Sequence, residues 1–442
     1  MRMRSVFMRL PAFAFAAVPL VVCAAPSAIE PIEPPARASF DAALIVMGAQ
    51  LAAIGNCKDC HTASAGKPYA GGWPLQTPFG TIYATNITPD VETGIGRWSE
   101  AAFRRAMHEG VDRQGRHLYP VFPYDHMTKV TDEDVKAIYA FVMTREPVHA
   151  ETPPNRMLFP LKIRSLIGGW KRLFFERGRF QPDPAQSAQW NRGAYLAEGL
   201  AHCGACHTPR NFLGAEKKAQ PFAGGEAESW HAPALNAASP APVPWTAEQL
   251  YRYLRDGFDD VHEIAAGPME GVTHNLAAVP EHDVRAIAVY IASLAAEPTL
   301  AHRQRSEEIL AYAKRAQTSA AAAGPRPAAV DAVQANQSGA AIYAGTCAVC
   351  HDNGRATSSS GALHLALSTS VTSPTPTNLI RIIVQGIRPR EGERGRWMPA
   401  FAGALTAEQL SDLTAFLRTD FGMAPAWRNV DYEVRKIMQG KE

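Results

Sequence analysis

The chain has 442 residues, of which 46% are hydrophobic and 19% are charged. At roughly 100–200 residues per domain, this length allows two to four domains, each with enough apolar side chains for a core. The 44 basic and 42 acidic residues leave a formal charge of only +2 at pH 7. Because nucleic-acid binding needs a strong basic excess, we expect no nucleic-acid partner.

The first 25 residues have the pattern of a secretory signal peptide. Three arginines precede an apolar run at residues 10–25, which is shorter than the about 20 apolar residues of a membrane span. We therefore expect residues 1–25 to be removed on export to the periplasm. Lipidation of Cys23 is the alternative, although Val22 is larger than the small residue that should precede a lipidated cysteine.

The six other cysteines form three copies of the motif Cys-x-x-Cys-His. Two thiols three positions apart can form thioethers with the two vinyl groups of one porphyrin, and the adjacent histidine then lies under the iron. A thioredoxin-like site does not require this histidine, and a structural zinc site needs four ligands where each copy offers three. We therefore predict three covalently bound haem c groups. They are attached at Cys57, Cys60, Cys203, Cys206, Cys347 and Cys350, with His61, His207 and His351 as the proximal iron ligands.

Three kinds of helix recur around the motifs. A helix with a glycine precedes each motif, and we expect the glycine to permit a close helix crossing. A second helix ends in glycine, a common helix stop. A third helix begins at residues such as Thr131, whose side chains can accept hydrogen bonds from the free N–H groups of the first helical turn. The three sets are expected at residues 46–51, 102–110 and from 131; at 191–196, 249–257 and from 280; and at 338–343, 378–386 and from 406.

This repeat predicts an all-α protein of three tandem class I-like cytochrome c domains, each wrapped on one haem. The domains are expected at residues 40–150, 186–300 and 336–420, with linkers at 151–185 and 301–335 and a C-terminal tail at 421–442.

An electron-transfer haem usually has both axial positions filled, and a methionine opposite histidine raises the potential. The ligand should lie between the second and third helices, where Met269 and Met398 each stand beside proline. Core packing is the commoner use of methionine, but each is alone in its loop, so we predict both as iron ligands. In the first domain Phe122 takes the matching position, and the alternatives are Met127, His126 or an open iron.

The first linker contains a stretch at residues 159–175 that is both basic and apolar. Such a segment either lies on a bilayer or a partner or, more commonly, packs on its own chain as an inter-domain helix. No later stretch is apolar enough to span a bilayer, so we expect peripheral membrane contact. The Ala/Pro-rich residues 316–335 predict a spacer before the third domain.

Several stretches extend the pattern beyond the haem motifs, namely Thr77–Trp98, His117–Pro120 and Gly204–Asn211. With them, residues 40–420 resemble the three-haem cytochrome c subunits of membrane-associated bacterial dehydrogenases that oxidise alcohols, gluconate, fructose or sorbitol, and of some molybdenum hydroxylases. Many members carry methionine where this chain has Phe122, so the resemblance does not assign the first iron's sixth ligand. The Phe-Pro-Tyr-Asp-His version at residues 122–126 is closer to relatives paired with molybdenum hydroxylases.

The resemblance implies a catalytic partner subunit with flavin, pyrroloquinoline quinone or a molybdenum cofactor. The cytochrome subunit would receive electrons at the periplasmic face of the inner membrane and pass them to ubiquinone or another cytochrome. We therefore predict an electron-transfer subunit without substrate chemistry of its own. One alternative is a haem enzyme, a peroxidase or small-oxyanion reductase, which needs an open first iron. The other is a free soluble electron shuttle.

Overall fold

The structure, a computed structural model, describes residues 26–318, 337–351, 362–388 and 396–440. The predicted signal peptide with Cys23 and residues 319–335 of the predicted second linker lie outside these ranges. Within them, no helix combines the length and apolar character needed to cross a membrane.

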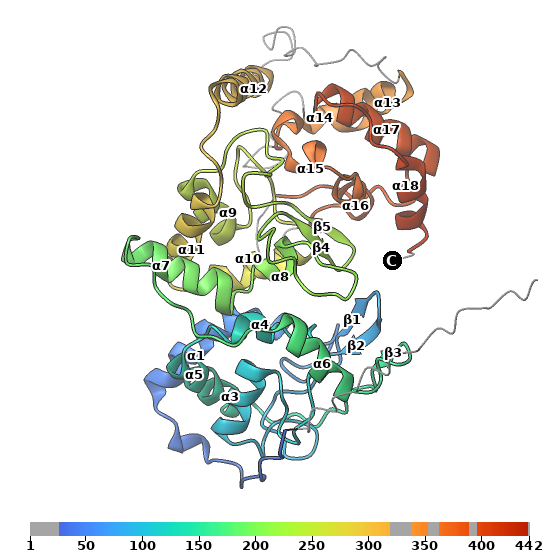
Figure 1. The fold of residues 1–442 in the computed structure, drawn as a ribbon. Helices are drawn as coiled ribbons and strands as arrows, with labels where there is room; N and C mark the ends of the chain where they lie inside the picture. Colours follow the sequence, from blue (N-terminus) through green and yellow to red (C-terminus); the bar gives the residue numbers. More distant parts are fainter. Residues whose placement is uncertain (1–25, 319–336, 352–361, 389–395, 441–442) are drawn as a thin grey trace, which may run out of the picture.

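Helices dominate the described residues, as predicted for an all-α protein, and they form three successive groups (Figure 1). The first group contains η1 (Arg37–Ser39), α1 (Ala42–Ile54), α2 (Cys57–Cys60), α3 (Glu100–Glu109), α4 (Tyr124–Met127) and α5 (Asp132–Met143). The second contains α7 (Ala188–Tyr195), η2 (Leu196–Leu200), α8 (Gly204–His207), α9 (Ala247–Asp256), α10 (Pro268–Ala277) and α11 (Glu281–Ser293). The third contains α13 (Gln337–Ile342), η3 (Tyr343–Cys347), α14 (Ala348–His351), η4 (Leu365–Leu367), α15 (Thr369–Thr372), α16 (Thr377–Gln385), α17 (Ala407–Asp420) and α18 (Val430–Met438). We call these groups units 1, 2 and 3.

Local signals set the helix ends, and the expected helices are present, although α1 extends beyond the expected residues 46–51 at both ends. The Thr131 side chain accepts a hydrogen bond from the N–H of Asp134 at the start of α5, and Thr406 forms a capping box with Gln409 at the start of α17. Helix α3 ends at Gly110, which has a positive φ of 59°.

Two small antiparallel sheets were not predicted. One has the order β1 (Pro74–Thr77), β2 (Gly80–Tyr83), β3 (Arg156–Met157), and the other pairs β4 (Gly225–Ala227) with β5 (Trp230–Ala232). Their strands have two to four residues, too few to show an alternation of apolar and polar side chains in sequence.

A glycine lets the first and last helices of each unit cross closely. A Cβ atom on Gly48 of α1 would lie 1.9 Å from the Ala137 carbonyl oxygen of α5, closer than any real Cβ approaches another atom. The matching distances are 1.9 Å from Gly193 to Ala286 and 2.3 Å from Gly339 to Asp412. The expected role of these glycines is confirmed in all three units.

The buried side chains do not divide into three separate cores. Units 1 and 2 share one cluster, which includes Ile54 and Val130 of unit 1 and Leu200 of unit 2. A second cluster fills unit 3 and takes in Ile309 of α12 (Leu300–Thr318), so this part of the predicted second linker is a packed helix. The predicted tail also packs, since α18 buries Val434 in the same cluster.

In the first linker, α6 (Ser165–Phe174) packs one face on its own chain. Ile167 and Lys171 are buried, and the Lys171 Nζ donates to the carbonyls of Glu109 and Gly110, both at 2.6 Å. Leu166 and Leu173 stay exposed on the same helix. The packed-helix interpretation of this linker therefore holds for one face of α6 only.

Replacing Gly193 by alanine is expected to lower the free energy of unfolding by about 1–3 kcal/mol, because overpacking of this size forces backbone or side chains to shift. Urea unfolding of the haem-loaded protein measures the change. Gly169→Ala is the matched control, since no atom lies within 4 Å of its added Cβ and alanine favours a helix over glycine. Equal stability of the two variants would contradict the close crossing.

Candidate haem-binding sites

Each attachment motif forms a short helical turn after the glycine-containing helix. In units 2 and 3 the π-helical segments η2 and η3 lie between the two. A helical turn places side chains three positions apart on the same face, so the two cysteines of each motif can face one porphyrin edge. All six cysteines are thiols of intermediate exposure. The local structure therefore provides the cysteine arrangement that two thioether bonds require.

Each predicted proximal histidine is oriented by one backbone carbonyl. A carbonyl oxygen only accepts, so Nδ1 must carry the proton and Nε2 keeps the lone pair that an iron needs. The Nδ1–H groups donate from His61 to Thr85 at 2.6 Å, from His207 to Pro233 at 2.6 Å and from His351 to Leu363 at 2.8 Å. Sequence reasoning missed these carbonyls, although Thr85 lies in a stretch that carries the family resemblance.

Burial keeps the attachment groups neutral. It lowers the pKa of His61 and of His207, so both imidazoles are uncharged near neutral pH. It raises the pKa of the Cys57 and Cys203 thiols to about 12. An uncharged imidazole is the form that can donate a lone pair to a metal.

In unit 3, one cavity contains the complete predicted ligand set. Cys347, Cys350, His351 and Met398 all line it, together with apolar side chains that include Leu379 and Ile383. Backbone hydrogen bonds of 2.9 Å in both directions between Met398 and Ile387 hold the methionine loop in place. Two thiols, an imidazole and a thioether in an apolar cavity are the donor set that a His–Met haem c requires.

Unit 2 contributes part of the wall of this third cavity. Asp259 and Glu263 line it, and Glu263 accepts hydrogen bonds from the Ser370 N–H at 2.9 Å and the Ser368 hydroxyl at 3.2 Å. Burial raises the pKa of Glu263. No local signal could have predicted this contact, because Glu263 lies 107 residues before Ser370.

Met269 lies at the start of α10 and is half-buried. The same helix packs against the first attachment motif, where Asn275 Nδ2 donates to Asp59 Oδ2 at 3.2 Å and also contacts Asn56. The helix that carries the predicted ligand of the second haem therefore lies beside the attachment site of the first.

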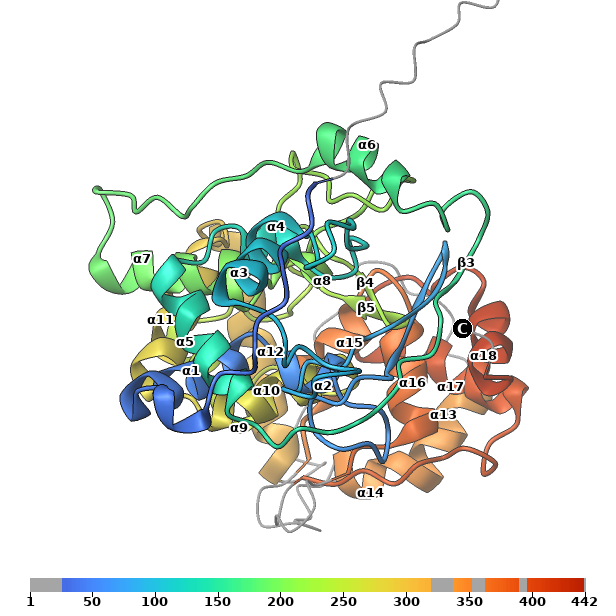
Figure 2. The ribbon, with the colours of Figure 1, turned by 90° about the horizontal axis from the view of Figure 1, so that it is seen from below.

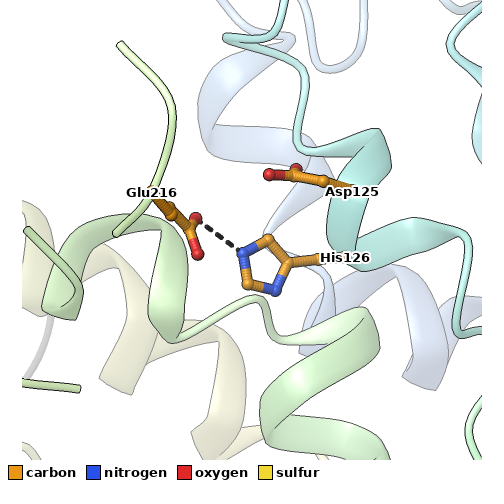
Figure 3. Close-up of side chains that lie close together, drawn as sticks. All are labelled: Asp125, His126 and Glu216. Carbon is orange, nitrogen blue, oxygen red and sulfur yellow. Dashed lines mark hydrogen bonds and ion pairs between the residues drawn. The ribbon is translucent and has the colours of Figure 1, made fainter. Parts of the chain in front are cut away.

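The two candidates for the first iron lie in different surroundings. Met127 is buried in the core that units 1 and 2 share. His126 instead engages unit 2 with both ring nitrogens, since Nδ1–H donates to the Glu198 carbonyl at 2.8 Å and Nε2 lies 2.8 Å from Glu216 Oε1 (Figure 3). Because both ring nitrogens of His126 contact groups of unit 2, Met127 is the candidate we retain for the first iron.

Comparison with known proteins identifies cytochrome c regions in this chain. The model of the cytochrome c family matches residues 45–146, and that of cytochrome c oxidase, cbb3-type, subunit III matches residues 334–417. The chain is 34% identical to the fructose dehydrogenase cytochrome subunit of Gluconobacter japonicus, over 93% of this chain and 86% of that protein. The chain belongs to the family of dehydrogenase cytochrome c subunits. It is also 34% identical to the gluconate 2-dehydrogenase cytochrome c subunit of Pantoea cypripedii, over 86% of each.

A further relative is longer than this chain. The chain is 45% identical to a subunit of the nicotinate dehydrogenase of Pseudomonas putida, over 92% of this chain but 33% of that protein. The chain thus spans about a third of this relative. Family membership makes the chain an electron-transfer subunit rather than a catalytic one, and neither the haem-enzyme nor the free-shuttle alternative is favoured.

Met398→Ala is expected to remove the thioether ligand of one haem. In near-infrared magnetic circular dichroism of the oxidised protein, one His–Met charge-transfer band should disappear, and the potential of that haem should fall because thioether ligation raises it. Met107→Leu is the control, since Met107 is a buried core residue and this swap conserves volume. Unchanged bands in Met398→Ala would exclude Met398 as a ligand.

Proposed function

We propose that this chain carries three covalent haem c groups in three cytochrome c domains and relays electrons from a catalytic dehydrogenase subunit to ubiquinone or a downstream cytochrome. The domains are residues 40–150, 186–300 and 336–420. The observation that carries the proposal is the threefold recurrence of a cysteine pair beside a histidine whose Nδ1–H is held by a carbonyl. When bound, the haems supply one-electron chemistry, and the chain orients their axial ligands and excludes water.

The proposed axial pairs are His61 with Met127, His207 with Met269, and His351 with Met398. Of these, the third has the strongest support, because both members line one cavity. A filled sixth position in all three haems suits electron transfer rather than binding of an exogenous ligand.

Unit 2 lies between units 1 and 3 (Figure 1). Its α10 packs on the first attachment motif through Asn275 and Asp59, and its Glu263 reaches the third cavity. These contacts support a relay in which the second haem passes electrons between the first and third.

The proposed partner is a catalytic subunit of the flavin, pyrroloquinoline quinone or molybdenum type that oxidises its substrate in the periplasm. The similarity to cytochrome subunits of fructose and gluconate dehydrogenases supports such a partner. The Phe-Pro-Tyr-Asp-His sequence at 122–126, which resembles that of relatives paired with molybdenum hydroxylases, makes the molybdenum type the first to test.

We also propose that an apolar surface beside α6 contacts the periplasmic face of the inner membrane. Trp170 Nε1 donates to the Leu213 carbonyl at 3.0 Å and joins α6 to the loop after the second motif. Figure 2 shows α6 at the edge of the molecule. The exposed apolar side chains of this surface are Leu158, Phe159, Ile163, Leu166, Leu173, Phe212 and Leu213. Lysines and arginines such as Lys162 and Arg172 accompany them, a combination typical of segments that lie on anionic lipid.

The relay is tested with the purified dehydrogenase complex. We expect three haems per chain from the haemochrome spectrum and the protein concentration. The double variant Cys203→Ser/Cys206→Ser should retain two haems and lose most reduction of a ubiquinone analogue, because the middle carrier is missing. Fewer than three haems in the unmodified chain, or full quinone reduction by the variant, would contradict the proposal.

Membrane contact is tested by flotation with vesicles that contain phosphatidylglycerol. The double variant Phe159→Glu/Phe212→Glu should bind at least about tenfold less, since two charges would enter the interface in place of rings that are 81% and 87% exposed. The control Val46→Glu changes an apolar residue that is 59% exposed on α1 and should bind normally. If the control and the double variant bind equally, another surface makes the contact.

A further inference from the structure

Three side chains from two units meet behind the second attachment motif. Asp125 and His126 come from α4 of unit 1, and Glu216 comes from the loop that follows α8 in unit 2 (Figure 3). One donor atom of each residue lies within 4.8 Å of the donor atoms of the other two. None of these atoms belongs to the proposed axial ligand pairs.

The His126 ring has the orientation of a metal ligand. Its Nδ1–H donates to the Glu198 carbonyl at 2.8 Å, and Nε2 lies 2.8 Å from Glu216. Without a metal, Nε2–H donates to this carboxylate as part of an ion pair, and a bound metal ion would take the place of that proton. The His126 side chain is 9% exposed and that of Glu216 is 15% exposed. Metal-binding histidines almost always donate their second N–H to a carbonyl or carboxylate, which fixes the ring and the tautomer.

Two carboxylates at this position need positive charge. Asp125 points toward Glu216 but forms no hydrogen bond with it or with His126 (Figure 3). Glu216 is ion-paired with His126 at 2.8 Å and with Arg210 at 3.7 Å. Because carboxylates removed from water are stable only when paired or bound to a metal, a cation at this position would also neutralise Asp125.

A second imidazole beside the cluster supports the same conclusion. Burial lowers the pKa of His202 to about 4, and the charges of His126 and Glu216 also affect this pKa. Its Nδ1 is buried and has no hydrogen-bond partner among the described residues. Buried polar atoms of this kind are rare, and each calls for a ligand, an ion or a water.

We propose that Asp125, His126 and Glu216 form a binding site for a divalent transition-metal ion of the zinc class that bridges units 1 and 2. Imidazole and carboxylate together suit zinc and its neighbours, whereas magnesium and calcium prefer oxygen ligands alone. The ion has no redox role, and this inference does not depend on the electron relay.

The position of the site gives it a structural consequence. A Cβ atom on Gly204 would lie 2.9 Å from the His126 Cε1, so the imidazole packs against the backbone between Cys203 and Cys206. A metal ion here holds α4 against the attachment motif of the second haem. It thereby fixes the distance between the first two haem sites.

The test uses the full-length, haem-loaded protein, treated with a chelator, loaded with micromolar Zn²⁺ and desalted. Elemental analysis should find one zinc per chain beside the haem iron. Asp125→Asn should weaken zinc binding about tenfold or more, because the affinity of a site depends on the charge of its ligands. This variant keeps the side-chain shape and breaks no hydrogen bond with His126 or Glu216, and an unchanged haem content verifies its fold. Glu216→Gln should have the same effect on zinc.

His149→Gln is the matched control. His149 also lies between two carboxylates, 3.8 Å from Asp90 and 3.4 Å from Glu92, but it is 59% exposed. Its loss should leave zinc binding unchanged. The proposal is overturned if the unmodified protein retains no zinc, if Asp125→Asn and Glu216→Gln bind as well as it does, or if His149→Gln removes the zinc. The cluster is then an ion pair between His126 and Glu216 that joins the units without a metal.

Discussion

The close crossing of the first and last helices in each unit is the contact on which the haem sites depend. Gly48, Gly193 and Gly339 each place a helix backbone directly against a carbonyl of the partner helix. In every unit the attachment motif follows this crossing closely in sequence. The crossing therefore fixes the position of the first cysteine of the motif. In unit 3, a larger side chain at Gly339 would move the motif away from the apolar cavity that α17 helps to line.

The haem sites also require that each proximal histidine be held in one tautomer, with the proton on Nδ1. In each unit the accepting carbonyl comes from a loop 12 to 26 residues after the histidine, at Thr85, Pro233 or Leu363. Each loop therefore has to close back on its motif before the imidazole is oriented. The side chain of the accepting residue is irrelevant, since any residue has a backbone carbonyl. This explains why the three accepting positions share no residue type.

Unit 2 packs directly against both of the other units. It shares a hydrophobic core with unit 1 through residues such as Leu200, and it inserts Glu263 into the wall of the cavity of unit 3. Helices α6 and α12, both inside predicted linkers, pack on the units that they join. The distances between the proposed haems are thus set by buried contacts, which electron transfer between fixed carriers requires. The proposed metal site at His126 acts on the same distance.

The sequence alone determined the features that depend on neighbours along the chain. These features are the spacing of the cysteines and histidines, the capping threonine Thr131 and the crossing glycines, all of which could be predicted because they are local. Met398 was predicted from its place in a loop, and it lines the cavity that contains the third motif. Tertiary structure alone decided which carbonyl holds each histidine, that His126 faces unit 2, and that Glu263 reaches unit 3. Those contacts join residues up to 107 positions apart, and they depend on how whole units pack, for which a single sequence has no local signal.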